Sequence, residues 1–198
     1  MPHLSPTLDS PSPTQTAVIV PVPAAESLVG QYRRELDPAD KWGVPAHVTV
    51  LYPFVEPTAA NESVVATLAS ILEPITAFDC CFLQTRWFGE DVLWLDPDPA
   101  EPFHRLTNAV WGAFPSCPPY GGAHQDVIPH LTVGECRQSD LLALEVAEQA
   151  VQSDLPLSAR IDQVLWIAGT QALSSWRVIQ GFNLRTPSPD HLTNAAEA

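Results

Sequence analysis

Two segments of the sequence carry a histidine, an apolar residue and a threonine in the same order. They read Pro45-Ala46-His47-Val48-Thr49-Val50 and Ile128-Pro129-His130-Leu131-Thr132-Val133. Residues i and i+2 of a β-strand point to the same face, about 6.6–6.8 Å apart, so each segment predicts an imidazole beside a hydroxyl. The apolar residue between them faces the core. Two such strands, paired about a pseudo-twofold axis, would present two imidazoles and two hydroxyls to one cleft.

Two imidazoles and two hydroxyls in one cleft supply the groups that cleave a phosphodiester. One histidine takes a proton from the attacking oxygen and the other gives a proton to the leaving oxygen, while the threonine hydroxyls bind the non-bridging phosphate oxygens. Histidine suits both roles because its ordinary pKa of about 6.5 lies near neutral pH. This chemistry needs no metal and no other cofactor. Zinc normally takes three or four protein ligands, and neither His-Glu-x-x-His nor paired cysteines occur, so we expect no metal site.

A third match to the pattern, His191-Leu192-Thr193, indicates how often it arises by chance. This match lies in a polar terminal segment, and we interpret it as accidental. The other two matches have apolar residues at the middle and following positions, which is typical of a strand with a buried face. The alternative for His47 and His130 is a pair of buried histidines satisfied by backbone partners. Matching threonines in matching strands favour catalysis over that alternative.

The strands with this pattern occupy equivalent places in two similar series of elements. Apolar periodicity predicts strands at 16–22, 47–54, 78–88, 91–95, 130–134, 157–168 and 175–184, and helices at 25–36, 61–72, 103–114 and 139–152. The order is β-α-β-α-β followed by β-α-β-α-β-β. We therefore expect one domain over residues 16–185, built from two intertwined repeats. Residues 1–15 and 186–198 are rich in Pro, Ser and Thr or are polar, and we expect loose tails there.

The composition limits the class of partner. The 198 residues include 9 Lys and Arg against 23 Asp and Glu, for a net charge of −14, and Lys41 is the sole lysine. Binding to long nucleic acid depends on clustered cations that displace counterions, so we expect a small partner instead. No apolar run approaches the roughly 18 residues of a membrane span. The four cysteines form no C-x-x-C pair, which favours a reducing, cytoplasmic location. Nothing in the sequence indicates an oligomeric state.

Three further residues are candidates for binding a substrate. Tyr120, in the Pro- and Gly-rich segment before the second histidine strand, could stack on a nucleobase, and packing within the loop is the equal alternative. His124 of the same segment could line the cleft, although a solvent-facing histidine is the commoner situation in a loop. Arg33, near the end of the first predicted helix, could reach a phosphate or only favour the helix C-terminus.

The duplicated His-x-Thr strands resemble those of the two-histidine (2H) phosphoesterase superfamily, especially its bacterial 2′-5′ RNA ligase-like branch. The likeness covers about residues 16–185 and includes HVTVLYPF at 47–54 and PPYGGAHQDVIPHLTVGE at 118–135. The resemblance implies an α+β, bilobal, pseudo-twofold fold, in which two antiparallel sheets flank a central cleft and helices pack on the outside. It also implies that His47 and His130 form the acid/base pair and that Thr49 and Thr132 bind phosphate.

The same resemblance implies metal-independent chemistry on 2′,3′-cyclic or 2′-5′ phosphodiesters. Members that process RNA carry basic residues around the cleft, whereas this chain is strongly acidic. We therefore expect a hydrolase that acts on a nucleoside 2′,3′-cyclic phosphate or a related small phosphodiester. One alternative is 2′-5′ ligation or cleavage at RNA ends, which uses the same four groups. The other is a module that binds a nucleotide without turnover.

Overall fold

The computed structural model describes residues 12–123, 126–136 and 141–186. In these residues the strands are β1 (Gln15–Pro21), β2 (His47–Leu51), β3 (Phe78–Phe88), β4 (Val92–Asp98), β5 (Leu131–Glu135), β6 (Leu157–Ile161), β7 (Gln163–Gly169) and β8 (Arg177–Asn183). The α-helices are α1 (Glu26–Leu36), α2 (Pro38–Trp42), α3 (Glu62–Leu72), α4 (Glu101–Ala113) and α5 (Leu141–Ser153). Short 3-10 turns are η1 (Pro23–Ala25), η2 (Pro57–Ala59) and η3 (Pro119–Gly122).

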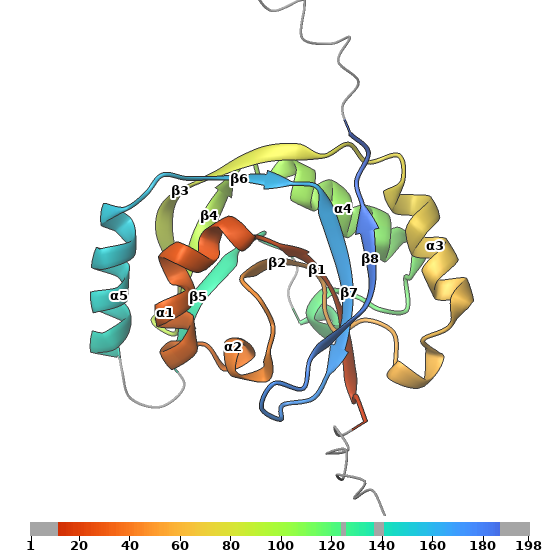
Figure 1. Ribbon diagram of the computed structural model, residues 1–198, viewed down its shortest axis with the longest axis horizontal. Helices are drawn as coiled ribbons and strands as arrows, with labels where there is room; N and C mark the ends of the chain where they lie inside the picture. Colours follow the sequence, from red (N-terminus) through yellow and green to blue (C-terminus); the bar gives the residue numbers. More distant parts are fainter. Residues whose placement is uncertain (1–11, 124–125, 137–140, 187–198) are drawn as a thin grey trace, which may run out of the picture.

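The named strands join in one antiparallel sheet with the order β6-β3-β4-β5-β2-β1-β7-β8. The sheet curls into a half-barrel (Figure 1). Its two halves meet at β2 and β5, whose ladder has a single register pair, Val48 with Leu131. The α+β, antiparallel architecture expected from the sequence is confirmed, whereas the division into two separate sheets is not, because β2–β5 pairing makes the sheet continuous.

Four helices cover one side of the sheet in two pairs. Helices α1 and α5 pack against β5 and each other, while α4 packs against β2 with α3 beside it (Figure 1). Each helix buries an apolar stripe, as Phe103, Leu106 and Val110 of α4 do. Val48 and Leu131 belong to the same core as these residues. Since side chains alternate along a strand, the residues on either side of Val48 and Leu131 face the opposite, hollow side of the sheet.

Helix α2 is an element that the sequence analysis does not predict, since it lies between the expected helix over 25–36 and the expected strand over 47–54. The Asp37 carboxylate accepts a hydrogen bond from the Ala39 amide at 2.9 Å and so caps a new helix. Pro38 suits its first position, where no amide hydrogen is needed. Gly43 ends the helix with a φ of 94°, a conformation that glycine adopts without a steric penalty. This short helix carries Trp42 to the hollow side of the sheet.

Several strand bounds also differ from the expected ones: β2 ends at Leu51, β4 extends to Asp98, and β5 begins at Leu131, directly after His130. The strand expected over 157–168 is two strands, β6 and β7, separated at Asp162. Strand β1 begins at Gln15, and the Thr14 amide donates to the Gly169 carbonyl oxygen at 2.9 Å, so regular pairing begins inside the expected N-terminal tail. Residues 1–11 and 187–198 of the expected tails lie outside the described residues.

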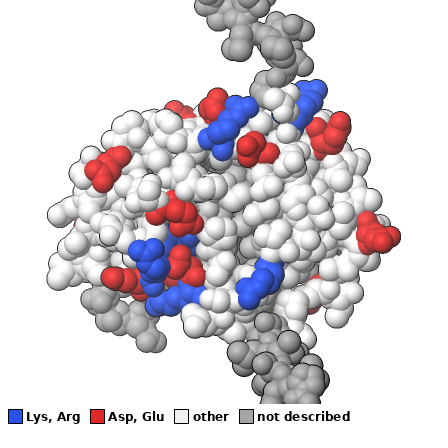
Figure 2. Space-filling model, in the orientation of Figure 1, with Lys and Arg blue, Asp and Glu red and all other residues white. Residues whose placement is uncertain are grey.

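The surface of the protein mixes charges of both signs. On the face shown in Figure 2, Lys and Arg lie in separate small groups, most of them beside Asp or Glu, and form no continuous basic track. Arg160 pairs with Asp79 and Arg105 with Glu101, both at 3.1 Å. Within the described ranges, every helix is too short or too polar to cross a membrane.

Candidate active site

The pairing of β2 with β5 brings the two His-x-Thr segments together. Their polar side chains, here called the motif side chains, are those of His47, Thr49, His130 and Thr132. Because Val48 lies opposite Leu131 in an antiparallel ladder, the histidine of each strand lies opposite the threonine of the other. Opposite residues are about 4.5–5.5 Å apart and diagonal residues about 7–8 Å apart. The two imidazoles therefore occupy diagonal corners of a four-cornered array.

Both histidine rings are held in the same way. The Nδ1 atom of His47 lies 2.7 Å from the Pro45 carbonyl oxygen, and that of His130 lies 2.8 Å from the Ile128 carbonyl oxygen. A carbonyl oxygen only accepts hydrogen bonds, so each Nδ1 donates its proton to the backbone. The neutral ring then carries its lone pair on Nε2, the atom left to meet a ligand. These are not fully satisfied core histidines, since the backbone occupies only one nitrogen of each ring.

The surroundings lower the pKa of both histidines. Burial, followed by the positive charges of Arg33 and His130, lowers the pKa of His47 from 6.5 to about 3. Burial also lowers the pKa of His130. The hydrogen bond to the backbone carbonyl acts in the opposite direction at each ring. Both imidazoles are therefore neutral at pH 7 in the free protein. A phosphate anion between them would favour the charged form and raise the pKa again.

Tyr120 reaches the motif side chains from η3, the turn ahead of β5. Its backbone has a φ of 52°, in the left-handed region that few residues other than glycine adopt. The Tyr120 amide donates to the Tyr52 carbonyl oxygen at 2.6 Å, and the Tyr120 and Thr49 hydroxyls are hydrogen-bonded to each other. Burial raises the pKa of Tyr120, so the phenol keeps its proton at neutral pH. The sequence left a stacking role and loop packing open for Tyr120; the structure brings its hydroxyl to Thr49.

The motif side chains and Tyr120 line one cavity of about 340 Å³ on the hollow side of the sheet. One end of this cavity is polar and holds the motif side chains. The other end is apolar and is formed by β1, α2, β7 and nearby loops, with the side chains of Ala17, Ile19, Trp42, Val44, Tyr52, Ile167 and Trp176. Asp37 and Glu135 bring carboxylates to the lining. Among the described residues no Lys or Arg lines it.

The apolar end of the cavity was not predicted from the sequence. Trp42, Tyr52 and Trp176 come from segments far apart in the chain, and only the fold brings them together. One signal was present in β1, where Ala17, Val18, Ile19 and Val20 are all apolar and all buried, without alternation. A strand buried on both faces needs a second apolar layer opposite the helices. That second layer is the apolar end of the cavity.

His130 packs against two aromatic rings. The ring centroid of Phe88 lies 4.9 Å from that of His130 and the centroid of Trp94 lies 5.9 Å from it, both edge-on. Phe88 and Trp94 stack on each other at 4.7 Å. These rings come from the ends of β3 and β4 beside β5. They limit the rotation of His130 and shield it from water, which accounts physically for the burial that lowers its pKa.

Arg33, one of the residues proposed from the sequence to bind a substrate, does not line the described cavity. Arg33 has a side chain only 1% exposed, and its guanidinium binds Asp37 and the Val44 carbonyl oxygen behind the site. The expectation that Arg33 could reach a substrate phosphate is therefore corrected, because the helix turns this side chain into the protein. His124 lies outside the described residues.

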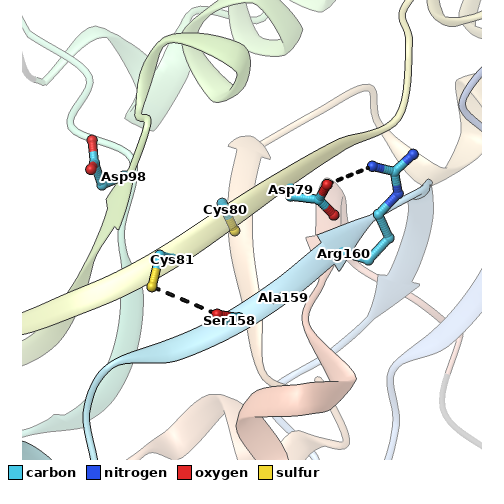
Figure 3. Close-up of a pocket in the computed structure, with 7 residues that line it drawn as sticks. All are labelled: Asp79, Cys80, Cys81, Asp98, Ser158, Ala159 and Arg160. Carbon is cyan, nitrogen blue, oxygen red and sulfur yellow. Dashed lines mark hydrogen bonds and ion pairs between the residues drawn. The ribbon is translucent and has the colours of Figure 1, made fainter. Parts of the chain in front are cut away.

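A second hollow, of about 490 Å³, lies where β3 meets β6 (Figure 3). Arg160 donates to Asp79 there at 3.1 Å, and the Cys81 thiol lies 3.8 Å from the Ser158 hydroxyl. Burial raises the pKa of the Cys80 thiol to about 12, so it is not a nucleophile at neutral pH. No histidine is among the described residues that line this hollow. No cluster of three or more His, Cys, Asp or Glu able to hold a metal occurs in the described ranges.

Comparison with known proteins gives the same family as the motif. The family model for the 2′-5′ RNA ligase superfamily matches residues 20–169. No curated protein matches the sequence significantly. Among solved structures, E. coli LigT complexed with 3′-AMP is similar, with a TM-score of 0.57 and 15% identity over 87% of this chain and 99% of that one.

A second similar structure is TT0787 of Thermus thermophilus, with a TM-score of 0.65 and 15% identity over 88% of this chain and 100% of that one. A third, described as a phosphoesterase, has a TM-score of 0.55 and 16% identity over 87% and 99% of the two chains. At these identities the structures show the shared fold. The family model, in contrast, spans most of the chain and both His-x-Thr segments, and the chain therefore belongs to the 2′-5′ RNA ligase superfamily of two-histidine phosphoesterases.

Proposed function

We propose that the protein is a metal-independent phosphodiesterase that hydrolyses a nucleoside 2′,3′-cyclic phosphate or a related small phosphodiester. One observation carries the proposal: each imidazole donates Nδ1–H to the backbone and so has Nε2 left for a substrate, in a cavity shared with Thr49 and Thr132. Two such nitrogens at diagonal corners match the two proton transfers of phosphodiester hydrolysis.

The reaction follows from that arrangement. The neutral imidazole takes a proton from water as the water oxygen bonds to phosphorus. The protonated imidazole gives its proton to the ribose oxygen as the bond between that oxygen and phosphorus breaks. The product is a phosphomonoester with a free hydroxyl, and the two imidazoles exchange protons with solvent to regain their starting forms. The threonine hydroxyls donate hydrogen bonds to the non-bridging oxygens, whose negative charge grows in the transition state.

The apolar end of the cavity supports a substrate of nucleotide size. A cavity of about 340 Å³ with Trp42 and Trp176 on its wall suits the flat, uncharged face of a nucleobase. LigT, which shares the fold, has been crystallised with 3′-AMP and with ATP. We place the phosphodiester among the motif side chains and the rest of the nucleoside against the aromatic wall.

The charge of the cavity favours a substrate with one negative charge over a polyanion. Its lining includes Asp37 and Glu135 but no described Lys or Arg. The whole chain has a net charge of −14. Each further phosphate of an RNA strand would therefore find no described Lys or Arg on the lining of this cavity. A phosphodiester monoanion, in contrast, needs only the charge of one protonated imidazole.

The test is a product-resolved assay with the four nucleoside 2′,3′-cyclic phosphates, 3′,5′-cyclic nucleotides, short 2′-5′ oligomers and an RNA oligomer ending in a 2′,3′-cyclic phosphate. We expect turnover of the 2′,3′-cyclic mononucleotides, with a KM that changes less than about threefold between about 50 and 200 mM salt. A strong preference for the RNA oligomer that weakens tenfold or more with salt would favour RNA-end processing. Binding without product from any of them would indicate a nucleotide-binding module.

A further inference from the structure

Arg33 lies behind the first histidine strand, and its charged side chain is buried in the protein. Its Nε donates to Asp37 Oδ2 at 2.9 Å and its Nη2 to the Val44 carbonyl oxygen at 3.1 Å. Its Nη1 lies 3.9 Å from Glu26 and 3.8 Å from Asp40, and it has no hydrogen-bond partner among the described residues. Taking a guanidinium out of water is unfavourable, so a buried arginine indicates a specific task.

Glu26 lies on the same face of α1, two turns before Arg33. Its Oε1 accepts a hydrogen bond from the Ala46 amide at 2.7 Å. Helix α1 therefore holds the chain on both sides of Pro45, at the Val44 carbonyl through Arg33 and at the Ala46 amide through Glu26. The Pro45 carbonyl in turn accepts the hydrogen bond from Nδ1 of His47. The direction of the His47 ring is thus set by two side chains of α1 that do not line the cavity.

The second histidine has no such support in the part of the chain that the structure describes. The equivalent segment before β5, residues 126–129, faces α4 across a hollow of about 440 Å³. The α4 side chains on that hollow are His104, Thr107, Asn108 and Trp111, and its carboxylates are Asp96 and Asp126. No arginine or lysine lies among the described residues that line it. The segment before His47 is therefore held by a buried arginine, which is itself surrounded by Glu26, Asp37 and Asp40, whereas no described Lys or Arg lines the hollow beside the segment before His130.

The charged and titratable groups around His47 come from three directions. Helices α1 and α2 bring Arg33, Glu26, Asp37 and Asp40, strand β5 brings His130 and Glu135, and the segments of η3 and β2 bring Tyr120 and Tyr52. Of these, Arg33 and His130 act on His47 to disfavour its charged form, in addition to burial. At His130 burial acts without a comparable fixed cation. The pKa of His47 is therefore lowered by a fixed positive charge as well as by burial, whereas the pKa of His130 is lowered by burial.

We infer that Arg33, with Glu26, is a positioning residue that holds His47 as the neutral general base and leaves His130 as the general acid. The assignment of His47 as general base and His130 as general acid rests on the proposed function. The order of the two histidine pKa values is a property of the free protein, in which both rings are neutral at pH 7. The buried guanidinium does two things at once, since it fixes the segment that orients the ring and disfavours a second positive charge beside it.

The first test is a titration of the wild-type protein by NMR, with the His47 and His130 Cε1–H signals assigned from the His47→Gln and His130→Gln variants. We expect His47 to titrate at a lower pH than His130. The opposite order would overturn the inference. No substrate is present, so this result stands apart from the question of which phosphodiester is hydrolysed. Loss of the proposed function would leave the titration order unchanged, and an inverted order would leave phosphodiesterase activity intact.

The second test compares Arg33→Met with Arg33→Lys, and uses Arg34→Met, at an exposed position of α1, as the control. Arg33→Met should raise the pKa of His47 by about one unit or more. It should also shift the acid limb of the pH profile of kcat/KM to higher pH, because the general base must be neutral. Arg33→Lys keeps the charge and should keep the titration, while it lowers kcat because a lysine cannot form the same fork of hydrogen bonds. An unmoved His47 titration in a folded Arg33→Met protein would overturn the inference. If Arg33→Met does not fold, the inference is tested by the order of titration in the wild type and by the kcat and His47 titration of Arg33→Lys.

Discussion

The hydroxyl of Tyr120 is hydrogen-bonded to the side chain of Thr49, although the two residues are far apart in the sequence. Thr49 and Thr132 occupy equivalent corners of the motif array, yet no described hydrogen bond holds Thr132 in the same way. The loop that carries Tyr120 adopts a left-handed conformation at this residue and is tied to Tyr52. One phosphate ligand of the proposed site is therefore oriented in advance by a second side chain.

Tyr120→Phe should lower kcat by about twofold to tenfold, the worth of one hydrogen bond. Thr49→Val should lower it further, because the proposed phosphate contact is lost as well. If Tyr120 acts through Thr49, adding Tyr120→Phe to Thr49→Val should cause little further loss, whereas adding it to Thr132→Val should cause the full loss. Steady-state kinetics of the three single variants and the two double variants measure this coupling. Equal effects of Tyr120→Phe in both backgrounds would show that Tyr120 does not act through Thr49.

Trp42 provides a test of the apolar end of the cavity. Trp42→Ala should raise KM for a nucleoside 2′,3′-cyclic phosphate by about tenfold and change kcat little, since stacking on a base contributes about 1–3 kcal/mol. The matched control is Trp111→Ala, because Trp111 is 41% exposed and does not line this cavity. An unchanged KM in Trp42→Ala would place the nucleoside elsewhere.

Local sequence patterns predicted the parts of the fold that depend on periodicity. Strand β3 has the expected bounds, Phe78–Phe88, and the helices near 26–36, 62–72 and 101–113 differ from the expected ones by only a few residues. The alternation in His47-Val48-Thr49 likewise set which side chains face the core, because a strand has a period of two. These features need no knowledge of distant contacts.

Features that depend on distant contacts could not be predicted in this way. Arg33 has the same sequence context as an exposed helix-end arginine, and only its contacts with Asp37 and Val44 show that it is buried. The apolar end of the cavity joins β1, α2 and β7, so Trp42 and Trp176 carry no local signal of their shared role. Strand order also depends on long-range pairing, which is why a continuous sheet appeared where two were expected.

His47 should make folding stability sensitive to acid. Burial lowers the pKa of His47 to about 3 in the folded protein, from 6.5. Between these values the unfolded chain binds one more proton at this position, so the free energy of unfolding falls as the pH drops below about 6.5. The His47→Gln variant lacks this titration and should lose less stability between about pH 7 and 4.5 than the wild type.

Urea unfolding at the two pH values measures the difference. His104→Gln is the control, because His104 is an exposed histidine of α4. Its replacement should leave the decrease in the free energy of unfolding at low pH unchanged. If the free energy of unfolding decreased equally at low pH in the wild type and in His47→Gln, the pKa of His47 would not be lowered in the folded protein.

Activity should be unchanged in millimolar EDTA. Two imidazoles and two hydroxyls supply every proton and hydrogen bond of the proposed transition state, so no step requires a Lewis acid. The check is turnover of a nucleoside 2′,3′-cyclic phosphate before and after chelation and dialysis. Loss of turnover that a divalent cation restores would require a different mechanism.

The central claim is that His47 and His130 act as one acid/base pair, and replacing each of them tests it most directly. His47→Gln and His130→Gln should each lower kcat/KM for a nucleoside 2′,3′-cyclic phosphate by about 10²–10⁴-fold, with the folded state verified by circular dichroism. The double variant should be about as slow as the slower single variant, because the two residues act as a unit. His104→Gln should keep full activity. If either single variant retained near wild-type kcat/KM on a substrate that the wild type hydrolyses, the two-histidine mechanism would be contradicted.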